Sequence, residues 1–254
     1  MKVKNILISQ TPPADFDKTP YADLKRKYSV NFDFYKFFKI ESVSTREFRD
    51  TKVNILNYTA VVFSSKNTID HFFSLVKELR VEIPEAMKYF CTTESTALYL
   101  QKYIAFRKRK IFFAKNSSTE AIFELFAKNK ELKYLIPCST DSVGTPYDEF
   151  FTQNEIEYSQ AIVFKTVPAD LKKDIDISKY DMIVFFSPSG IRSLRYNFPD
   201  FEQGDIAFGA LGHAVEEAIK AEGWTVHAVA PTKEAPSITA ALDIFFKDHA
   251  TKRR

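Results

Sequence analysis

The fold is decided by a stretch that the chain carries twice, YTAVVFSSKNTI at residues 58–69 and YDMIVFFSPSGI at 180–191. A second pair follows each copy in the same order, STEAIFELF at 118–126 and SITAALDIF at 237–245. The copies are 122 residues apart in the first pair and 119 in the second. Solenoid repeats recur every ~20–50 residues, so a period this long predicts a duplicated domain.

Around these stretches, short apolar runs alternate with amphipathic helical patterns. Strand-then-helix alternation is typical of βα units and parallel sheets, so we expect an α/β protein of two similar domains. Parallel βαβ sheets bind ligands at the carboxyl ends of their strands, which places the expected site in a cleft shared by the two domains. The predicted strands are 5–9, 32–38, 60–63, 89–92, 111–113, 134–137, 158–164, 182–186, 206–208 and 226–229.

Composition narrows the class of protein. The 254 residues carry a net charge of only +3, with one dense basic run at 107–110 that leads into an apolar strand. Nucleic-acid binding favours a basic stripe with stacking aromatics, so no nucleic-acid partner is expected. The start of the chain lacks a signal peptide's apolar core and no run is long enough for a membrane span, so we expect a soluble cytoplasmic protein. Cys91 and Cys138 are expected to be buried free thiols.

The usual catalytic and cofactor motifs are absent from the sequence. There is no dinucleotide-binding or P-loop glycine pattern, no nucleophile elbow, and no metal-ligand spacing among the four histidines. We therefore expect neither a metal nor a cofactor.

Small hydroxyl residues instead follow several predicted strands, at the turns where helices begin. Ser64 and Ser65 follow one strand, and Ser187 and Ser189 follow its counterpart in the second half. A helix N-terminus favours anions, and its N–H groups and neighbouring hydroxyls can bind a carboxylate. Each of these residues could equally be an N-cap with no ligand. The recurrence of the turns in both halves favours the anion site.

Five stretches resemble the uroporphyrinogen-III synthase family. The turns at 63–65 and 185–191 resemble its paired Phe-Thr-Ser motifs, and IAFGALGH at 206–213 resembles its C-terminal signature. NILIS at 5–9 resembles its first strand, and AIVFKTV at 161–167 its returning strand.

The resemblance implies a discontinuous topology. Residues 1–35 and 168–254 would form one domain and residues 42–161 the other. The strands at 36–41 and 162–167 would together form a two-stranded β linker between the domains. It also implies a cofactor-free cyclising lyase that takes hydroxymethylbilane, a linear tetrapyrrole, and closes it with inversion of ring D to uroporphyrinogen III. The chain would act as a monomer in the cytoplasm, with no membrane partner.

Carried over by position, the resemblance assigns substrate binding to hydroxyl, glycine and histidine positions. Phe164 stands where the family often has a tyrosine that assists hydroxide loss, and a phenyl ring cannot donate that proton. His213-Ala214-Val215 stands where the family has Pro-Thr-Thr after its glycine. The residues assigned are Ser64, Ser65, Thr96, Ser187, Ser189, Gly212 and His213.

Two other hypotheses remain at this point. The departures at 164 and 213–215 would suit a non-catalytic relative that binds a tetrapyrrole or another anion. Exposed phenylalanines such as Phe37, Phe38 or Phe72 would suit a scaffold for protein partners, although their spacing fits a core better.

Overall fold

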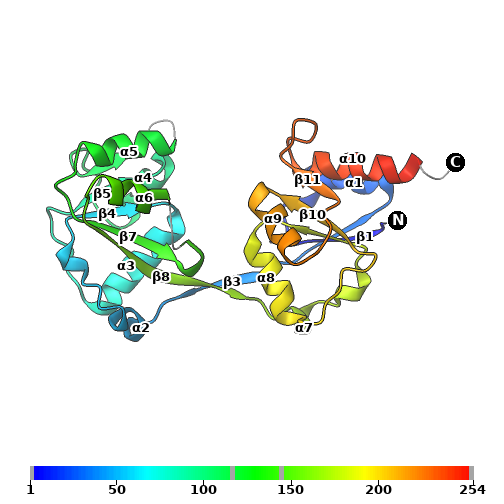
Figure 1. Cartoon of the computed structure of the whole chain (residues 1–254), viewed down its shortest axis with the longest axis horizontal. Helices are drawn as coiled ribbons and strands as arrows, with labels where there is room; N and C mark the ends of the chain where they lie inside the picture. Colours follow the sequence, from blue (N-terminus) through cyan, green and yellow to red (C-terminus); the bar gives the residue numbers. More distant parts are fainter. Residues whose placement is uncertain (1–2, 115–117, 143–145, 252–254) are drawn as a thin grey trace. The chain divides into compact units, whose positions relative to one another are not determined.

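The computed structural model describes residues 3–114, 118–142 and 146–251. The chain folds into two compact units, one formed by Met1–Lys39 with Val167–Arg254 and the other by Ile40–Thr166 (Figure 1). Unit 1 is therefore built from both ends of the chain, and unit 2 from its middle. Each unit holds one sheet with helices packed on both faces, as parallel sheets require.

Unit 1 contains a five-stranded sheet in the order β11-β10-β9-β1-β2, in which every neighbouring pair is parallel. Its strands are β1 Asn5–Ile8, β2 Asn31–Phe34, β9 Met182–Phe185, β10 Ala207–Leu211 and β11 Ala228–Ala230. Its helices are α1 Pro20–Tyr28, α7 Leu171–Asp174, α8 Pro188–Asn197, α9 His213–Ala221 and α10 Ile238–Thr251.

Unit 2 contains a six-stranded sheet in the order β3-β8-β7-β4-β5-β6. Its strands are β3 Phe38–Ser42, β4 Ala60–Phe63, β5 Lys88–Cys91, β6 Ile111–Phe113, β7 Tyr134–Ser139 and β8 Tyr158–Pro168. Its helices are α2 Thr45–Asp50, α3 Lys66–Leu79, α4 Glu94–Tyr99, α5 Thr119–Ala127 and α6 Pro146–Gln153. The mixed α/β class with parallel sheets in two domains is confirmed.

Burial on both faces explains why the central strands read as continuous apolar runs. In β4 the side chains of Val61 and Phe63 pack under α3, whereas Ala60 and Val62 pack under α5. All four residues are at most 1% exposed. The two predicted thiols, Cys91 and Cys138, are buried and free, and burial raises the pKa of Cys91 to about 12.

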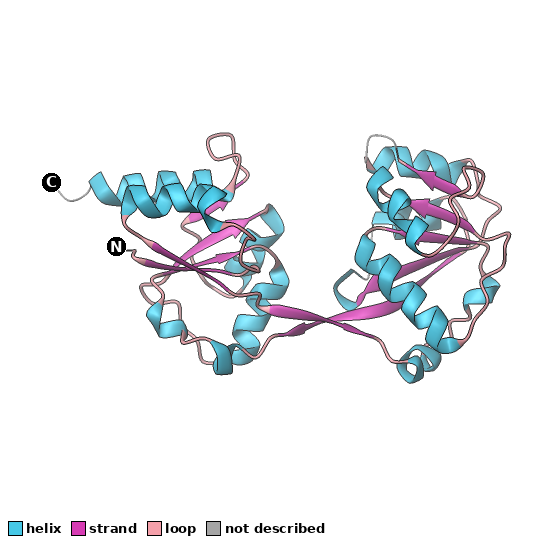
Figure 2. Cartoon of the chain, turned by 180° about the vertical axis from the view of Figure 1, so that it is seen from behind, coloured by secondary structure: helices cyan, strands magenta, loops and turns pink. Residues whose placement is uncertain are grey.

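The predicted strand at 32–38 is wrong, because the structure divides it in two. β2 ends at Phe34, and Phe37 is fully buried in unit 1, edge-on to the Phe185 ring at 5.9 Å. The chain then enters β3, which pairs with β8, and these two strands join the units (Figure 2). The apolar run is continuous in the sequence, but Phe37 belongs to neither strand, and its ring packs in the core of unit 1.

The β3–β8 pair is antiparallel. Val43 N–H donates to the Val163 carbonyl at 3.2 Å, and Ala169 N–H donates to the Phe37 carbonyl at 2.8 Å. β8 runs four residues past its predicted end at Phe164, as far as Pro168. Among the described residues, no helix is long and apolar enough to cross a membrane.

Asn197 fixes the point where the chain returns to unit 1. It is 6% exposed, and its Oδ1 accepts from Leu171 N–H at 3.0 Å. Its Nδ2 donates to the carbonyls of Ala169 at 2.8 Å and Ser193 at 2.9 Å. One side chain therefore satisfies three backbone groups and ties the start of α7 to the end of α8.

Replacing Asn197 with alanine is expected to lower the free energy of unfolding by about 3 kcal/mol, because it leaves buried backbone groups unpaired. Urea denaturation followed by circular dichroism measures the loss. Asn154→Ala is the matched control, because Asn154 Nδ2 makes a similar bond to the Phe150 carbonyl at a less buried position. Equal losses in the two variants would contradict the role assigned to Asn197.

Candidate functional site

The strand-to-helix turns of unit 2 lie at one edge of its sheet. β4 and β5 are parallel and in register from Ala60↔Lys88 to Phe63↔Cys91, so the residues after both strands meet at the carboxyl edge. Thr92 N–H donates to the Phe63 carbonyl at 3.1 Å, and Thr92 Oγ1 donates to the Ser64 carbonyl at 3.2 Å.

Ser65 caps α3 in a reciprocal arrangement with Thr68. Ser65 Oγ accepts from Thr68 N–H at 3.2 Å, and Thr68 Oγ1 accepts from Ser65 N–H at 3.1 Å. This capping box satisfies the N–H groups of Ser65 and Thr68 with each other's side chains. The hydroxyl of Ser65, predicted as a ligand, is thus engaged in the helix start.

Thr93 caps α4 in the same way, and Thr96 is its partner. Thr93 Oγ1 accepts from Thr96 N–H at 3.2 Å and lies 2.9 Å from Thr96 Oγ1. Thr96 is only 4% exposed. Thr96 therefore sits under the cap, while the exposed hydroxyls of this turn belong to neighbouring residues.

Ser64 differs from these caps because its side chain is exposed, and no hydrogen bond to its hydroxyl occurs among the residues the structure describes. Lys66, the first residue of α3, is also exposed, and its Nζ lies 5.4 Å from the ring centroid of Tyr99. A free hydroxyl and a cation thus stand together at the start of α3. Lys66 is not among the residues predicted from the sequence, although it follows directly after the two serines of the predicted turn.

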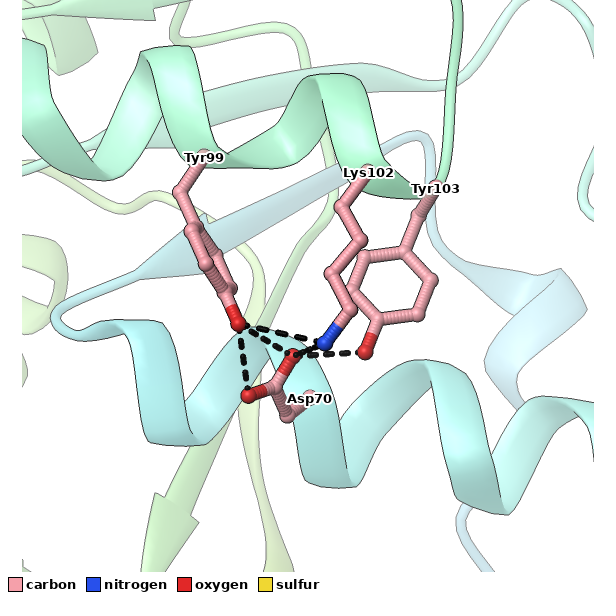
Figure 3. A network of polar contacts seen from close by, with 4 residues as sticks. All are labelled: Asp70, Tyr99, Lys102 and Tyr103. Carbon is pink, nitrogen blue, oxygen red and sulfur yellow. Dashed lines mark hydrogen bonds and ion pairs between the residues drawn. The ribbon is translucent and has the colours of Figure 1, made fainter.

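A polar network fixes α3 to the end of α4 and to the segment that follows it (Figure 3). Asp70 on α3 accepts from Tyr99 Oη at 2.9 Å, Tyr103 Oη at 2.5 Å and Lys102 Nζ at 3.0 Å. Burial raises the pKa of Asp70, but these three hydrogen bonds outweigh it and hold the pKa below its usual value. The network keeps the two capped turns in one fixed arrangement.

The turn after β9 in unit 1 has a different chemistry. Ser187 is the N-cap of α8, yet its side chain accepts no capping hydrogen bond. Pro188 and Ser189 follow, and Arg192 Nη2 donates to Ser189 Oγ at 3.0 Å. The start of α8 therefore has no side-chain cap, although Pro188 carries no N–H and Gly190 N–H already donates to the Ser187 carbonyl at 3.0 Å. The Arg192 guanidinium lies one turn further on.

The next strand, β10, leads into a second helix start without a side-chain cap. Gly212 is the N-cap of α9 at a φ of 95°, a left-handed conformation that a glycine adopts readily. His213 begins the helix, with its side chain 84% exposed and its Nδ1 3.9 Å from Glu216 Oε2. β9 and β10 are adjacent and parallel, with Val184 beside Gly209, so both uncapped helices start at the same edge.

Ser9, directly after β1, lies at this same edge and was not predicted as a site residue. β1 pairs with β9, and Ser9 N–H donates to the Val184 carbonyl at 2.9 Å. Ser9 is 3% exposed, and its Oγ has no hydrogen-bond partner within the described part of the chain. A Cβ built on Gly190, in the first turn of α8, would lie 3.6 Å from this oxygen. Its place after a strand, like that of Ser64, is the signal that could have found it.

Phe164 is a core residue of unit 2. It is 8% exposed and stacks with the imidazole of His71 at a centroid distance of 4.9 Å. His71 Nδ1 lies 3.0 Å from Ser42 Oγ, and partial burial lowers the pKa of His71 while the charge of Asp70 opposes that shift. The group beside the phenyl ring is thus an imidazole paired with a hydroxyl.

The described residues contain no group of three or more His, Cys, Asp or Glu side chains placed to hold a metal ion. Of the predicted residues, the structure brings Ser187, Ser189, Gly212 and His213 to one edge of unit 1. It places Ser64, Ser65 and Thr96 at one edge of unit 2. The groups at these edges that can bind anions are N–H groups, hydroxyls and cationic side chains.

Comparisons with known proteins give one family. A family model described as uroporphyrinogen-III synthase HemD matches residues 20–240. No curated protein sequence matches the chain. Two solved structures of similar fold are the synthetase of Helicobacter pylori, at 16% identity and a TM-score of 0.55, and a mutant synthase of Thermus thermophilus, at 11% and 0.52. The alignments cover 99% and 98% of this chain, respectively, and 100% of each of the others.

At these identities the two structures show a common fold, whereas the family match spans most of the chain. The turns, the returning strand and the glycine before α9 all lie inside the matched residues. The chain belongs to the uroporphyrinogen-III synthase family.

Proposed function

We propose that this cyclising hydro-lyase of tetrapyrrole biosynthesis holds the carboxylates of hydroxymethylbilane at the carboxyl edges of its two sheets. The observation that carries the proposal is the pair of uncapped helices, α8 and α9, on adjacent strands of unit 1. At the start of α9 the N–H groups of His213 and Ala214 need acceptors outside the helix, and the helix dipole favours a negative charge at both helix starts.

The substrate supplies such acceptors, because hydroxymethylbilane is a linear tetrapyrrole with eight carboxylates. Its terminal hydroxyl leaves with a proton as water, and the resulting azafulvene is attacked at the substituted carbon of ring D. A spiro intermediate then fragments and recloses as isomer III, whereas the unassisted reaction gives isomer I. Positioning of the chain is therefore the main task of the protein, and fixed backbone donors suit it.

Unit 2 would contribute through Ser64 and Lys66. The Ser64 hydroxyl is exposed and the Lys66 ammonium stands in the first turn of α3. Ser65 and Thr96 would support these turns indirectly. The Ser65 hydroxyl caps α3, and Thr96 Oγ1 lies 2.9 Å from the Thr93 hydroxyl that caps α4. Hydrogen bonds to charged acceptors are roughly twice as strong as neutral ones, so two groups suffice to orient one carboxylate.

The proton for the departing hydroxide must come from a group other than Phe164. We propose a water or a neighbouring hydroxyl in that role, and Ser42 is such a hydroxyl, bonded to the imidazole that stacks on Phe164. Nothing in the comparisons favours the alternative of a non-catalytic binding relative. We also propose that the enzyme acts as a cytoplasmic monomer without nucleic acid, which its modest charge of +3 supports.

A coupled assay tests the reaction. Freshly generated hydroxymethylbilane is mixed with the protein, and the oxidised products are separated into uroporphyrin isomers. We expect isomer III to predominate. Isomer I alone, formed at the spontaneous rate, would contradict catalysis and leave a binding protein.

Ser64 and Ser65 provide a matched pair of substitutions. Ser64→Ala should raise KM roughly tenfold, the cost of one hydrogen bond to a charged group, with stability unchanged within about 0.5 kcal/mol. Ser65→Ala should lower the free energy of unfolding by about 1 kcal/mol through loss of the cap. Steady-state kinetics and urea denaturation separate the two effects. If both variants shift KM equally, Ser64 is not a ligand.

His213 and His249 provide the second pair. His213 begins α9 with its ring exposed, whereas His249 Nδ1 lies 2.8 Å from the Phe245 carbonyl near the end of α10. His213→Ala is expected to raise KM several-fold and His249→Ala to leave it unchanged, measured in the same coupled assay. Identical kinetics for the two variants would remove His213 from the site.

A further inference from the structure

Unit 2 carries a pocket at the opposite ends of its strands from the hydroxyl turns. The pocket has a volume of about 240 Å³ and lies where the chain enters β5 and β6. Its walls are apolar and come from two segments, Ile83, Pro84 and Met87 before β5, and Ile104 and Ala105 before β6. β5 and β6 are paired in register at Tyr89↔Ile111, which holds the two segments side by side.

Tyr89 lines this pocket as a buried phenol. The residue is 4% exposed, and its ring stacks on Phe63 at 6.3 Å between centroids. No hydrogen bond to its hydroxyl is found in the described parts of the chain. Burial raises the pKa of Tyr89 to about 12, so the hydroxyl stays protonated and remains a donor. Since Tyr89 lines the pocket, an acceptor on a bound molecule could receive the hydrogen bond of this phenol there.

The remaining lining residues are charged, and two cations share one carboxylate. Arg107 Nη1 lies 2.5 Å from Glu85 Oε1, and Lys110 Nζ lies 3.4 Å from the same oxygen and also donates to the Glu85 carbonyl. The Lys110 side chain is only 18% exposed. Lys108 and Arg109 between them are exposed, so the segment is strongly positive. Glu85 neutralises the charges of Arg107 and Lys110 only in part, so these two side chains can attract an anion.

We propose that this pocket binds a small single-ring aromatic carboxylate. The ring would occupy the apolar walls, Arg107 and Lys110 would hold the carboxylate, and a polar substituent on the ring would accept from Tyr89. A cavity of about 150 Å³ holds benzene, so the larger volume here accommodates a substituted ring. Charge complementarity at the mouth selects the anion over neutral analogues.

This site is separate from the one proposed for catalysis. Tyr89 stands near the start of β5, whereas Thr92 and Thr93 follow its carboxyl end. A strand of four residues spans about 13 Å, so a molecule of one ring cannot reach both ends. The inference does not rest on the proposed function, and a loss of binding here would leave isomer formation unchanged.

The probe is 4-hydroxyphenylacetate, titrated against the full chain by saturation-transfer NMR, with 4-hydroxyphenylacetamide as its neutral analogue. We expect saturable binding with a dissociation constant in the millimolar range, typical of so small a ligand, and binding of the amide about tenfold weaker. Ala105→Phe should abolish binding by filling the pocket from its exposed rim, and Tyr89→Phe should weaken it several-fold.

Ala127→Phe is the matched control, because Ala127 is an exposed alanine at the end of α5, away from the lining residues. It should bind as the wild type does. Absence of saturable binding to the wild type, or equal binding by the Ala105 and Ala127 variants, would overturn the proposal.

Discussion

Every helix that follows a parallel strand in this protein starts at the carboxyl edge of a sheet, with N–H groups that the helix cannot satisfy itself. The two units meet that constraint differently. In unit 2, Ser65, Thr93 and Ser118 cap α3, α4 and α5 with their own side chains. In unit 1, Ser237 Oγ accepts from Ala240 N–H at 3.2 Å at the start of α10, but α8 and α9 have no side-chain cap. The duplicated plan has thus kept its backbone, while two helix starts of unit 1 lack the side-chain caps that their counterparts in unit 2 have.

How far the sequence predicts the structure depends on whether local signals decide. The strands at Ala60–Phe63 and Ile111–Phe113 have the predicted bounds, because their apolar runs are flanked by clear turns. The run at 32–38 was misread, since only the tertiary packing of Phe37 shows that the chain leaves the sheet there. The strand order, with β1 between β2 and β9, depends on pairings across most of the chain and is not visible in periodicity.

The same distinction holds for the candidate site. The hydroxyl-rich turns were predictable from their places after strands, but which hydroxyls are engaged was not. Ser65 and Ser64 are adjacent and chemically identical, and only the geometry of α3 shows that one caps the helix. Ser9, Lys66 and Arg192 were missed because no motif marks them. Their roles come from what lies beside them, namely Gly190, Tyr99 and Ser189.

The central place of β1 in the sheet of unit 1 has a consequence for how the protein is made. β1 is synthesised long before its partner β9, which begins only at Met182. At 5–20 residues per second, this apolar strand waits roughly 10–30 s with one edge unpaired. Unit 2 lies wholly within that interval and can close first. Unit 2 can therefore be complete while unit 1 is not, and β1 keeps an unpaired edge until β9 is made.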